Sequence, residues 1–289
     1  MNRRLPIWDH PVLNKEFRQR MRIARTPWII FLYLGIAGTL IFAYMFLIAH
    51  PAGVFHPEGS RFLFIGLSII QLVLLAFVVP GLTAGVISGE RERQTLSVLL
   101  TMPLSSGGII LSKWIAALAF VILLILSSLP LYASVFLFGG VSPAELLYTI
   151  VHLLVTVCFW GALGVFFSTL IRRTGVAMVT TYCTVAMIMV FLPVALYFIN
   201  QFYERFVDRP PSPSPLVVEL LPGLHPVMTQ LSVFYGEMAG MDGGIDIYWM
   251  YVAVYAVLSA VLLIAASHLL SPVRRKKKSS SPGSPEGDS

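Results

Sequence analysis

The sequence predicts an all-α integral membrane protein, and three observations lead to this fold class. Hydrophobic residues make up 57% of the 289 residues and charged residues only 12%, whereas about a quarter of the residues of an ordinary soluble domain are charged. Six apolar runs are each long enough to cross a hydrocarbon core of roughly 30 Å. Lys and Arg gather at both ends of the chain and between alternate runs.

The six apolar runs are the predicted transmembrane spans of a single membrane domain, residues 28–270. Charged residues lie only at the ends of the runs, as the high cost of an ion in lipid requires. No soluble domain of globular size is expected. The spans are Trp28–Ala49, Phe62–Ile87, Lys113–Phe138, Glu145–Leu170, Val176–Ile199 and Ile247–Leu270.

The distribution of basic residues predicts the orientation of the chain. All of the 20 Lys and Arg residues except Arg61, Arg205 and Arg209 precede the first span, follow the second, fourth or sixth span, or begin the third. Because cytoplasmic segments carry an excess of Lys and Arg, we expect a multi-pass protein of the cell membrane with both termini in the cytoplasm. The net charge of +6 suits anionic lipid and requires no nucleic-acid partner.

A charged segment after the second span, residues 88–103, predicts a helix on the cytoplasmic surface. Ser88 suits the start of a helix, and Glu90 and Glu92 suit the positive end of its dipole. Pro103 stops the helix. Apolar residues follow at spacings of three and four and form one face: Leu96, Leu99, Leu100 and Leu104. A helix of this kind offers that face to another protein.

A second cytoplasmic helix is predicted within residues 1–27. Pro11 suits a first helical position, and Pro27 turns the chain into the first span. A basic amphipathic helix of this kind lies at the inner leaflet, and the alternative is an anchor that acts through positive charge alone. The apolar face holds Leu13, Phe17, Met21 and Ala24, and the basic face holds Lys15, Arg18, Arg22 and Arg25.

Two further segments lie outside the spans. Residues 200–246 form a predicted external loop, far longer than ordinary connections, and its apolar part is broken by Pro222, Gly223 and Pro226. We expect short helices there that dip into the outer leaflet or cap an external cavity. Residues 271–289 form a predicted disordered basic tail in the cytoplasm.

The sequence contains no motif for catalysis, nucleotide binding or metal binding. It has no Gly-x-x-x-x-Gly-Lys-Ser/Thr phosphate loop, no His-Glu-x-x-His and no Gly-x-Ser-x-Gly. His152 and His268 lie in spans without a second His or carboxylate three or four residues on, and a histidine of this kind is most often an interhelical hydrogen bonder. Cys158 and Cys183 are expected to be small core residues.

Two cytoplasmic segments resemble the permease subunits of ABC-2 type exporters. The run Glu-Arg-Glu-Arg-Gln-Thr-Leu-Ser-Val-Leu-Leu-Thr-Met-Pro-Leu-Ser from Glu90, followed by Ile109 and Lys113, resembles the segment after the second span of that family. The run His-Pro-Val-Leu-x-Lys-Glu-x-Arg from His10 resembles its elbow helix. The layout of elbow, six spans and long outer loop covers the whole chain. Gln94 departs from the family pattern because a glycine is common there, and Ser112 stands where a glycine often precedes the lysine.

The resemblance implies that the surface helix is a coupling helix, seated in a groove of a separate cytoplasmic ATP-binding subunit. The leucine face would fill that groove, and the two glutamates would meet basic or helix-terminal groups there. The implied coupling residues are Glu90, Arg91, Glu92, Thr95, Leu96, Leu99, Leu100 and Pro103. The implied elbow residues are Pro11, Leu13, Lys15, Glu16, Phe17, Arg18 and Met21.

The resemblance also implies how this chain takes part in export. ATP-driven closure of two ATP-binding subunits would rearrange the spans around a cavity between two permease chains, as a homodimer or a related heterodimer. ATP and Mg would bind to the partner subunit. This chain would bind no cofactor, would hold no catalytic or metal site, and would not itself be an enzyme.

Other function classes stay open at this stage. An ion-driven secondary carrier would have a charged or unwound residue in mid-span and an internal repeat. Neither is visible, although Pro80, Pro130 and Pro193 could break helices. A non-transporting membrane anchor for a cytoplasmic assembly would use the same docking helix, and an intramembrane enzyme is disfavoured by the missing motifs.

Overall fold

A computed structural model describes residues 25–49, 57–96, 105–137, 140–206, 223–235 and 244–279. All regular secondary structure within these ranges is helical. The elements are α2 (Arg25–Ala49), α3 (Pro57–Thr83), α4 (Ser88–Glu92), α6 (Ser106–Leu137), α7 (Pro143–Leu170), α8 (Thr174–Ala186), the π-helical turn η2 (Met187–Phe191), α9 (Leu192–Phe206), α11 (Pro226–Tyr235) and α12 (Gly244–Ser279).

Within the described ranges, five helices are long and apolar enough to cross a membrane. They are α3, α6, α7, the continuous helix α8–η2–α9, and α12, which correspond to the second to sixth predicted spans. The predicted all-helical membrane architecture is therefore confirmed. The first predicted span, Trp28–Ala49, lies within α2, a helix of 25 residues. That sixth crossing stays a prediction.

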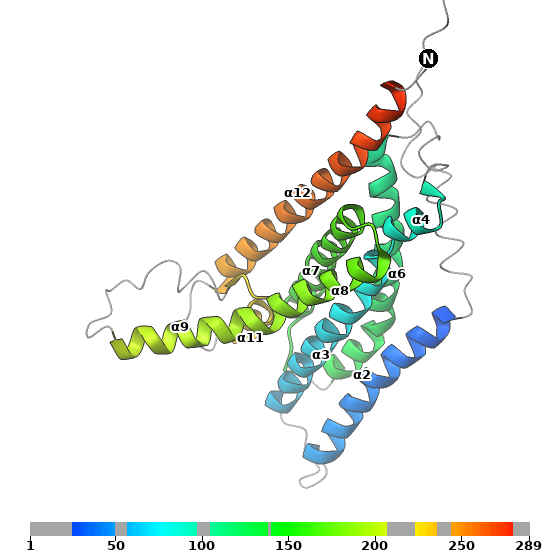
Figure 1. The fold of residues 1–289 in the computed structure, drawn as a ribbon. Coiled ribbons are helices and arrows are strands. Elements are labelled where there is room, and N and C mark those ends of the chain that lie inside the picture. Colours follow the sequence, from blue (N-terminus) through cyan, green and yellow to red (C-terminus); the bar gives the residue numbers. More distant parts are fainter. Residues whose placement is uncertain are drawn as a thin grey trace, which may run out of the picture.

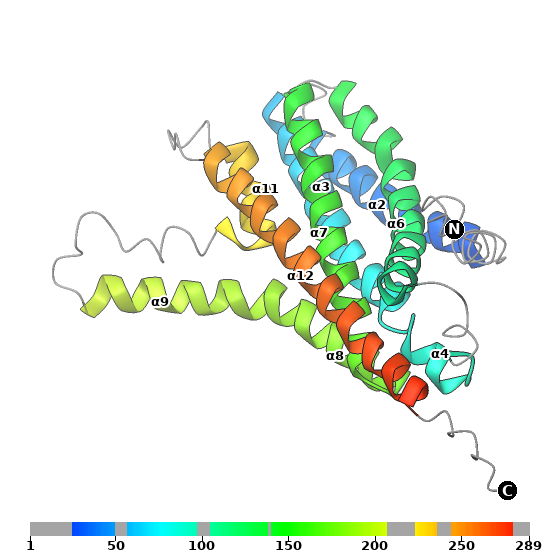
Figure 2. The same cartoon turned by 90° about the horizontal axis from the view of Figure 1, so that it is seen from above.

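Helix α7 lies at the centre of the bundle and contacts α3, α6, α8, α11 and α12, whereas α2 packs against α3 and α6 (Figures 1 and 2). The continuous helix α8–η2–α9 begins beside the end of α7 and then leaves the bundle as a long arm (Figure 1). Apolar side chains cover this arm and are exposed: Val190, Phe191, Val194, Tyr197, Phe198, Ile199 and Phe202. A surface of this kind suits lipid or another membrane helix.

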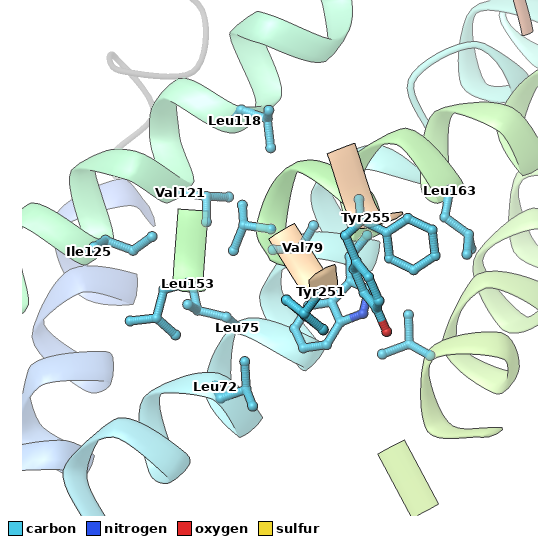
Figure 3. Close-up of a cluster of buried hydrophobic side chains, with 14 residues drawn as sticks. Leu72, Leu75, Val79, Leu118, Val121, Ile125, Leu153, Leu163, Tyr251 and Tyr255 are labelled. Carbon is cyan, nitrogen blue, oxygen red and sulfur yellow. The ribbon is translucent and has the colours of Figure 1, made fainter. Parts of the chain in front are cut away.

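The largest apolar core joins five helices, α3, α6, α7, α12 and, through Val185, α8 (Figure 3). Trp160 of α7 is fully buried within it, and α12 contributes the tyrosines Tyr251 and Tyr255. The aliphatic members come from α3, α6 and α7: Leu72, Leu75, Val79, Leu118, Val121, Ile125, Leu153, Val157, Leu163. This interdigitated core fixes the relative positions of the helices that carry the site described below.

Gly164 lets the end of α3 lie directly on α7. A Cβ atom at this position would fall 2.0 Å from Thr83 Oγ1, 2.9 Å from Thr83 Cβ and 3.3 Å from the backbone nitrogen of Ala84. Thr83 is the last residue of α3, and its hydroxyl donates to the Val79 carbonyl at 2.8 Å. Any side chain at position 164 would therefore push the end of α3 away from α7.

An ion pair ties three elements together at the opposite end of the bundle. Arg61 Nη2 of α3 lies 3.0 Å from Glu145 Oε1 of α7, and the same guanidinium group donates to the Phe234 carbonyl of α11. Glu145 also forms a capping box with Ser142, with bonds of 3.2 Å and 2.7 Å between side chains and backbone amides. This pair brings α11, a short helix within the predicted 200–246 loop, back onto the bundle.

Two predicted boundaries differ from the structure. The tail from Ser271 was expected to be disordered, but α12 continues to Ser279. Lys and Arg are good helix formers, and their charge suits the negative C-terminal end of the helix dipole. The helix therefore extends beyond its apolar residues. The helix of the fifth predicted span also extends past Ile199, because α9 ends at Phe206. The predicted loop of residues 200–246 is therefore shorter.

We expect Gly164→Ala to destabilise the bundle, because the added methyl group would overlap Thr83 at the end of α3. Overpacking of this kind lowers the free energy of unfolding by about 1–3 kcal/mol. Gly66→Ala is the matched control, because a Cβ atom there meets nothing within 4 Å. Unfolding of both variants by SDS in mixed micelles measures the difference. Equal stability of the two variants would contradict the close α3–α7 contact.

Candidate functional site

The chain leaves α3 and enters α4 through a turn at residues 84–87. The backbone N–H groups of Ile87 and Ser88 both donate to Ser168 Oγ of α7, at 2.8 Å and 3.0 Å. Ser168 is fully buried. Because a buried N–H group without a partner is costly, this hydroxyl stabilises the non-helical turn. Sequence reasoning missed Ser168, since a single serine on a helix forms no recognisable pattern.

A partly buried ion pair joins α4 to the start of α6. Lys113 Nζ lies 3.0 Å from Glu90 Oε1, and the lysine side chain is only 3% exposed, while that of Glu90 is 30% exposed. The Thr95 hydroxyl also donates to Glu90, both to its carboxylate and to its carbonyl. Burying an ammonium group is costly without a nearby negative charge. Glu90 therefore fixes α4 against α6.

Glu92 joins α4 to the start of α8. Its carboxylate accepts hydrogen bonds from the Thr174 backbone N–H at 2.8 Å and from the Thr174 hydroxyl at 2.7 Å. The backbone bond first, and then the hydroxyl bond, lower the pKa of the Glu92 carboxyl, so it stays ionised at neutral pH. Arg91 Nη2 adds a bond of 3.2 Å to the Thr169 carbonyl at the end of α7. Together with the Glu90 pair, these bonds tie α4 to three long helices.

The helix predicted over residues 88–103 is interrupted after α4. Gln94 has a φ angle of 59°, the left-handed conformation that favours glycine. The Gln94 N–H donates to the Arg91 carbonyl at 3.1 Å, and the Thr95 N–H donates to the Glu90 carbonyl at 3.0 Å, which is the Schellman ending of a helix. The turn explains physically why a glycine suits this position, and it corrects the prediction of one unbroken helix.

Leu96 packs inside the chain itself. Its side chain is 7% exposed and belongs to an apolar cluster with Ile87, Ile109, Val165 and Leu270. Within this chain, Leu96 therefore packs internally. The other predicted coupling residues Leu99, Leu100 and Pro103, and all of the predicted elbow residues, lie outside the described residues.

The two glutamates have partners within this chain. Glu90 meets a basic group, and Glu92 meets a helix start. The exposed residues of the corner are Glu92, Arg93, Gln94 and Thr95, beside the exposed Arg172 and Arg173 at the α7–α8 turn. In the part of the chain that the structure describes, no three His, Cys, Asp or Glu residues gather to hold a metal. The corner is thus a charged surface that suits docking.

The fold and this corner define a multi-pass, all-helical membrane protein with a fixed charged turn at one end of its bundle. Residues 10–280 match the family model described as ABC-2 family transporter protein, and the chain belongs to this family. The resemblance found in the cytoplasmic segments is confirmed, and the chain is an ABC transporter permease, a class of membrane transporter and not of enzyme. A search of curated proteins found no match.

We expect Glu90→Gln and Lys113→Met each to destabilise the corner. The double variant should lose less stability than the sum of the losses in the two single variants. Glu90→Gln removes the carboxylate beside a buried ammonium group, so each single substitution should lower the free energy of unfolding by about 1–3 kcal/mol. A coupling energy of at least about 0.5 kcal/mol is expected from the double-mutant cycle, measured by unfolding in micelles. Arg93→Met, at an exposed position, is the control. If the two stability losses were strictly additive, the ion pair would contribute nothing to the free energy of unfolding.

Proposed function

We propose that this chain is the membrane-spanning permease subunit of an ABC exporter, driven by a separate cytoplasmic ATP-binding subunit that docks at the α4 corner. One observation carries this function: the exposed turn at Glu92–Thr95 is bonded through α4 to the ends of α6, α7 and α8. A displacement imposed on the turn would reach three spans at once. The sequence contains no phosphate loop, so the energy must come from a partner.

The α4 corner faces the cytoplasm in this function. Arg91, Arg93, Lys113, Arg172 and Arg173 all belong to elements at this end of the bundle, whereas Arg61 lies at the opposite end with Glu145. An excess of basic residues on one side is typical of the cytoplasmic side. Both termini would then be cytoplasmic, and the protein would reside in the cell membrane.

The complete architecture that we propose adds the parts outside the described residues. It has an elbow helix at residues 1–27, six spans over 28–270, a coupling segment at 88–103, an external loop within 200–246 and a basic cytoplasmic tail at 271–289. The contact of Arg61 with both Glu145 and the Phe234 carbonyl supports a loop that closes the outer end of the bundle.

A second permease chain, identical or related, would complete the translocation path. The long arm α8–η2–α9 buries little of its surface within one chain, and its exposed apolar side chains support contact with lipid or with that second chain. ATP and Mg would bind to the ATP-binding subunits, and this chain would bind no cofactor. Membership of a transporter family favours transport over the role of a passive membrane anchor.

We expect the double variant Leu99→Ala with Leu100→Ala to weaken docking of the ATP-binding subunit. Truncation of buried interface leucines typically costs at least about 1 kcal/mol, or roughly a fivefold loss of affinity. Co-purification of the ATP-binding subunit, normalised to correctly inserted permease, measures this loss. The permease purified alone should hydrolyse no ATP.

Leu96→Ala is the matched control, because Leu96 packs within this chain. It should lower the free energy of unfolding by about 2–5 kcal/mol while leaving co-purification per folded molecule unchanged. Unchanged co-purification and unchanged coupled transport in the double variant would remove the coupling role from the leucine face. Loss of co-purification per folded molecule with Leu96→Ala alone would instead place Leu96 itself in the docking contact.

A further inference from the structure

Four arginines gather where α4 packs against the start of α8 (Figure 2). Arg91 and Arg93 lie at the end of α4, and Arg172 and Arg173 lie in the turn between α7 and α8. The Arg91 guanidinium group donates to the Thr169 carbonyl at 3.2 Å, and it lies close enough to Arg172 for the two charges to repel each other. Like charges this close are unfavourable unless an anion lies beside them.

The acidic residues of this region do not balance the arginines. The segments that form the α4 corner contain two acidic residues, Glu90 and Glu92. Glu90 pairs with Lys113, while Glu92 bonds to Thr174 and acts on the charge of Arg173 without forming a salt bridge. Within the described ranges, no salt bridge involves any of the four arginines. The corner therefore keeps an excess of positive charge that suits a bound anion.

An exposed apolar stripe begins on α8 directly after the arginines. Its members follow one another at spacings of three and four, so they share one face of the helix. They are Val176, Val179, Cys183, Met187 and Val190, and all are exposed. The prediction that Cys183 is a core residue is therefore wrong. A stripe of this kind suits the acyl chain of a lipid, which is as apolar as the side chains themselves.

The arginine turn lies at the depth of lipid headgroups. Two helices that are long and apolar enough to cross a membrane meet at this turn: Pro143–Leu170 ends before it, and the helix from Thr174 begins after it. The ends of two adjacent spans lie at the membrane surface. The charged turn and the apolar stripe thus match the two parts of a phospholipid, its phosphate group and its acyl chain.

We propose that Arg91, Arg172 and Arg173 bind the phosphate group of an anionic phospholipid whose acyl chain lies along the stripe from Val176 to Val190. Guanidinium groups bind phosphate oxygens through paired, charge-assisted hydrogen bonds. A zwitterionic lipid is bound more weakly, because its ammonium group would lie beside guanidinium groups that already lack an opposite charge.

This lipid site is distinct from the surface proposed to dock the ATP-binding subunit. Arg93 lies on the exposed turn that follows α4 and is not part of the lipid site, which faces the stripe on α8. The lipid site requires only that the chain lies in a bilayer. It does not rest on the proposed function, so either assignment can fail without the other.

Cys183 provides a reporter on the stripe itself. The chain contains two cysteines, so Cys158→Ala leaves Cys183 as the single site for a bimane label. The labelled full chain is placed in nanodiscs of phosphatidylcholine, and brominated phosphatidylglycerol or brominated phosphatidylcholine is added to quench the label. We expect phosphatidylglycerol to bind beside Cys183 at least about fivefold more strongly, because each basic residue near the surface attracts anionic lipid. Added salt should weaken this preference.

The variant Arg172→Gln with Arg173→Gln should abolish most of the preference for phosphatidylglycerol. The matched control is Lys276→Gln with Lys277→Gln, which removes the same charge from the end of α12 and should keep the preference. A second control moves the label to α6 through Leu126→Cys in a chain without the two natural cysteines. Leu126 is exposed, and a label there should be quenched equally by both brominated lipids.

Three results would overturn the lipid site. The first is equal quenching of the Cys183 label by the two lipids in the otherwise unaltered chain. The second is an equal loss of preference in the arginine and lysine variants, which would show diffuse attraction to the whole basic side. The third is absence of the preference together with lost co-purification of the ATP-binding subunit in Arg172→Gln with Arg173→Gln, which would assign these arginines to an acidic protein surface.

Discussion

The hydroxyl group of Ser168 is the contact on which the α4 end of the bundle depends. Within a bundle surrounded by lipid, every backbone N–H group needs a hydrogen-bond partner inside the protein. A helix can therefore end only where another group accepts the N–H groups of the turn that follows. Ser168 Oγ accepts the N–H groups of both Ile87 and Ser88, and it thereby permits the turn between α3 and α4. Gly164, one helical turn earlier on α7, gives the end of α3 the space to reach that position.

Once α3 ends there, the short helix α4 is fixed to several spans. Lys113 pairs with Glu90, Thr174 bonds to Glu92, and Arg91 bonds to the end of α7. α4 is too short to be stable alone, since isolated helices much below about 12 residues are marginal in water. Its order comes from these contacts. A partner that moves this corner would therefore move helix ends, and would not simply bend a loose loop.

Much of the fold could be predicted because long apolar runs and the positions of Lys and Arg depend on composition alone. The site was harder to predict. The spacing of Leu96, Leu99 and Leu100 defines a helix face but does not say whether this chain or another covers it, and Leu96 proved to be covered by its own chain. Within the chain, Glu90 pairs with Lys113 and Glu92 bonds to Thr174, contacts that the sequence pattern did not indicate. The role of Ser168 depends on packing across helices, which no local pattern encodes.

The most direct measurement of the coupling account is site-specific photocrosslinking in living cells with p-benzoyl-phenylalanine at Arg93, an exposed residue of the α4 corner. We predict a crosslink to a chain that carries a Gly-x-x-x-x-Gly-Lys-Ser/Thr phosphate loop, identified by mass spectrometry, with a yield that changes when ATP is depleted. The same probe at Trp249, exposed near the start of α12, should capture no such chain. Failure to capture an ATP-binding chain at position 93, or equal capture at both positions, would contradict docking at this corner.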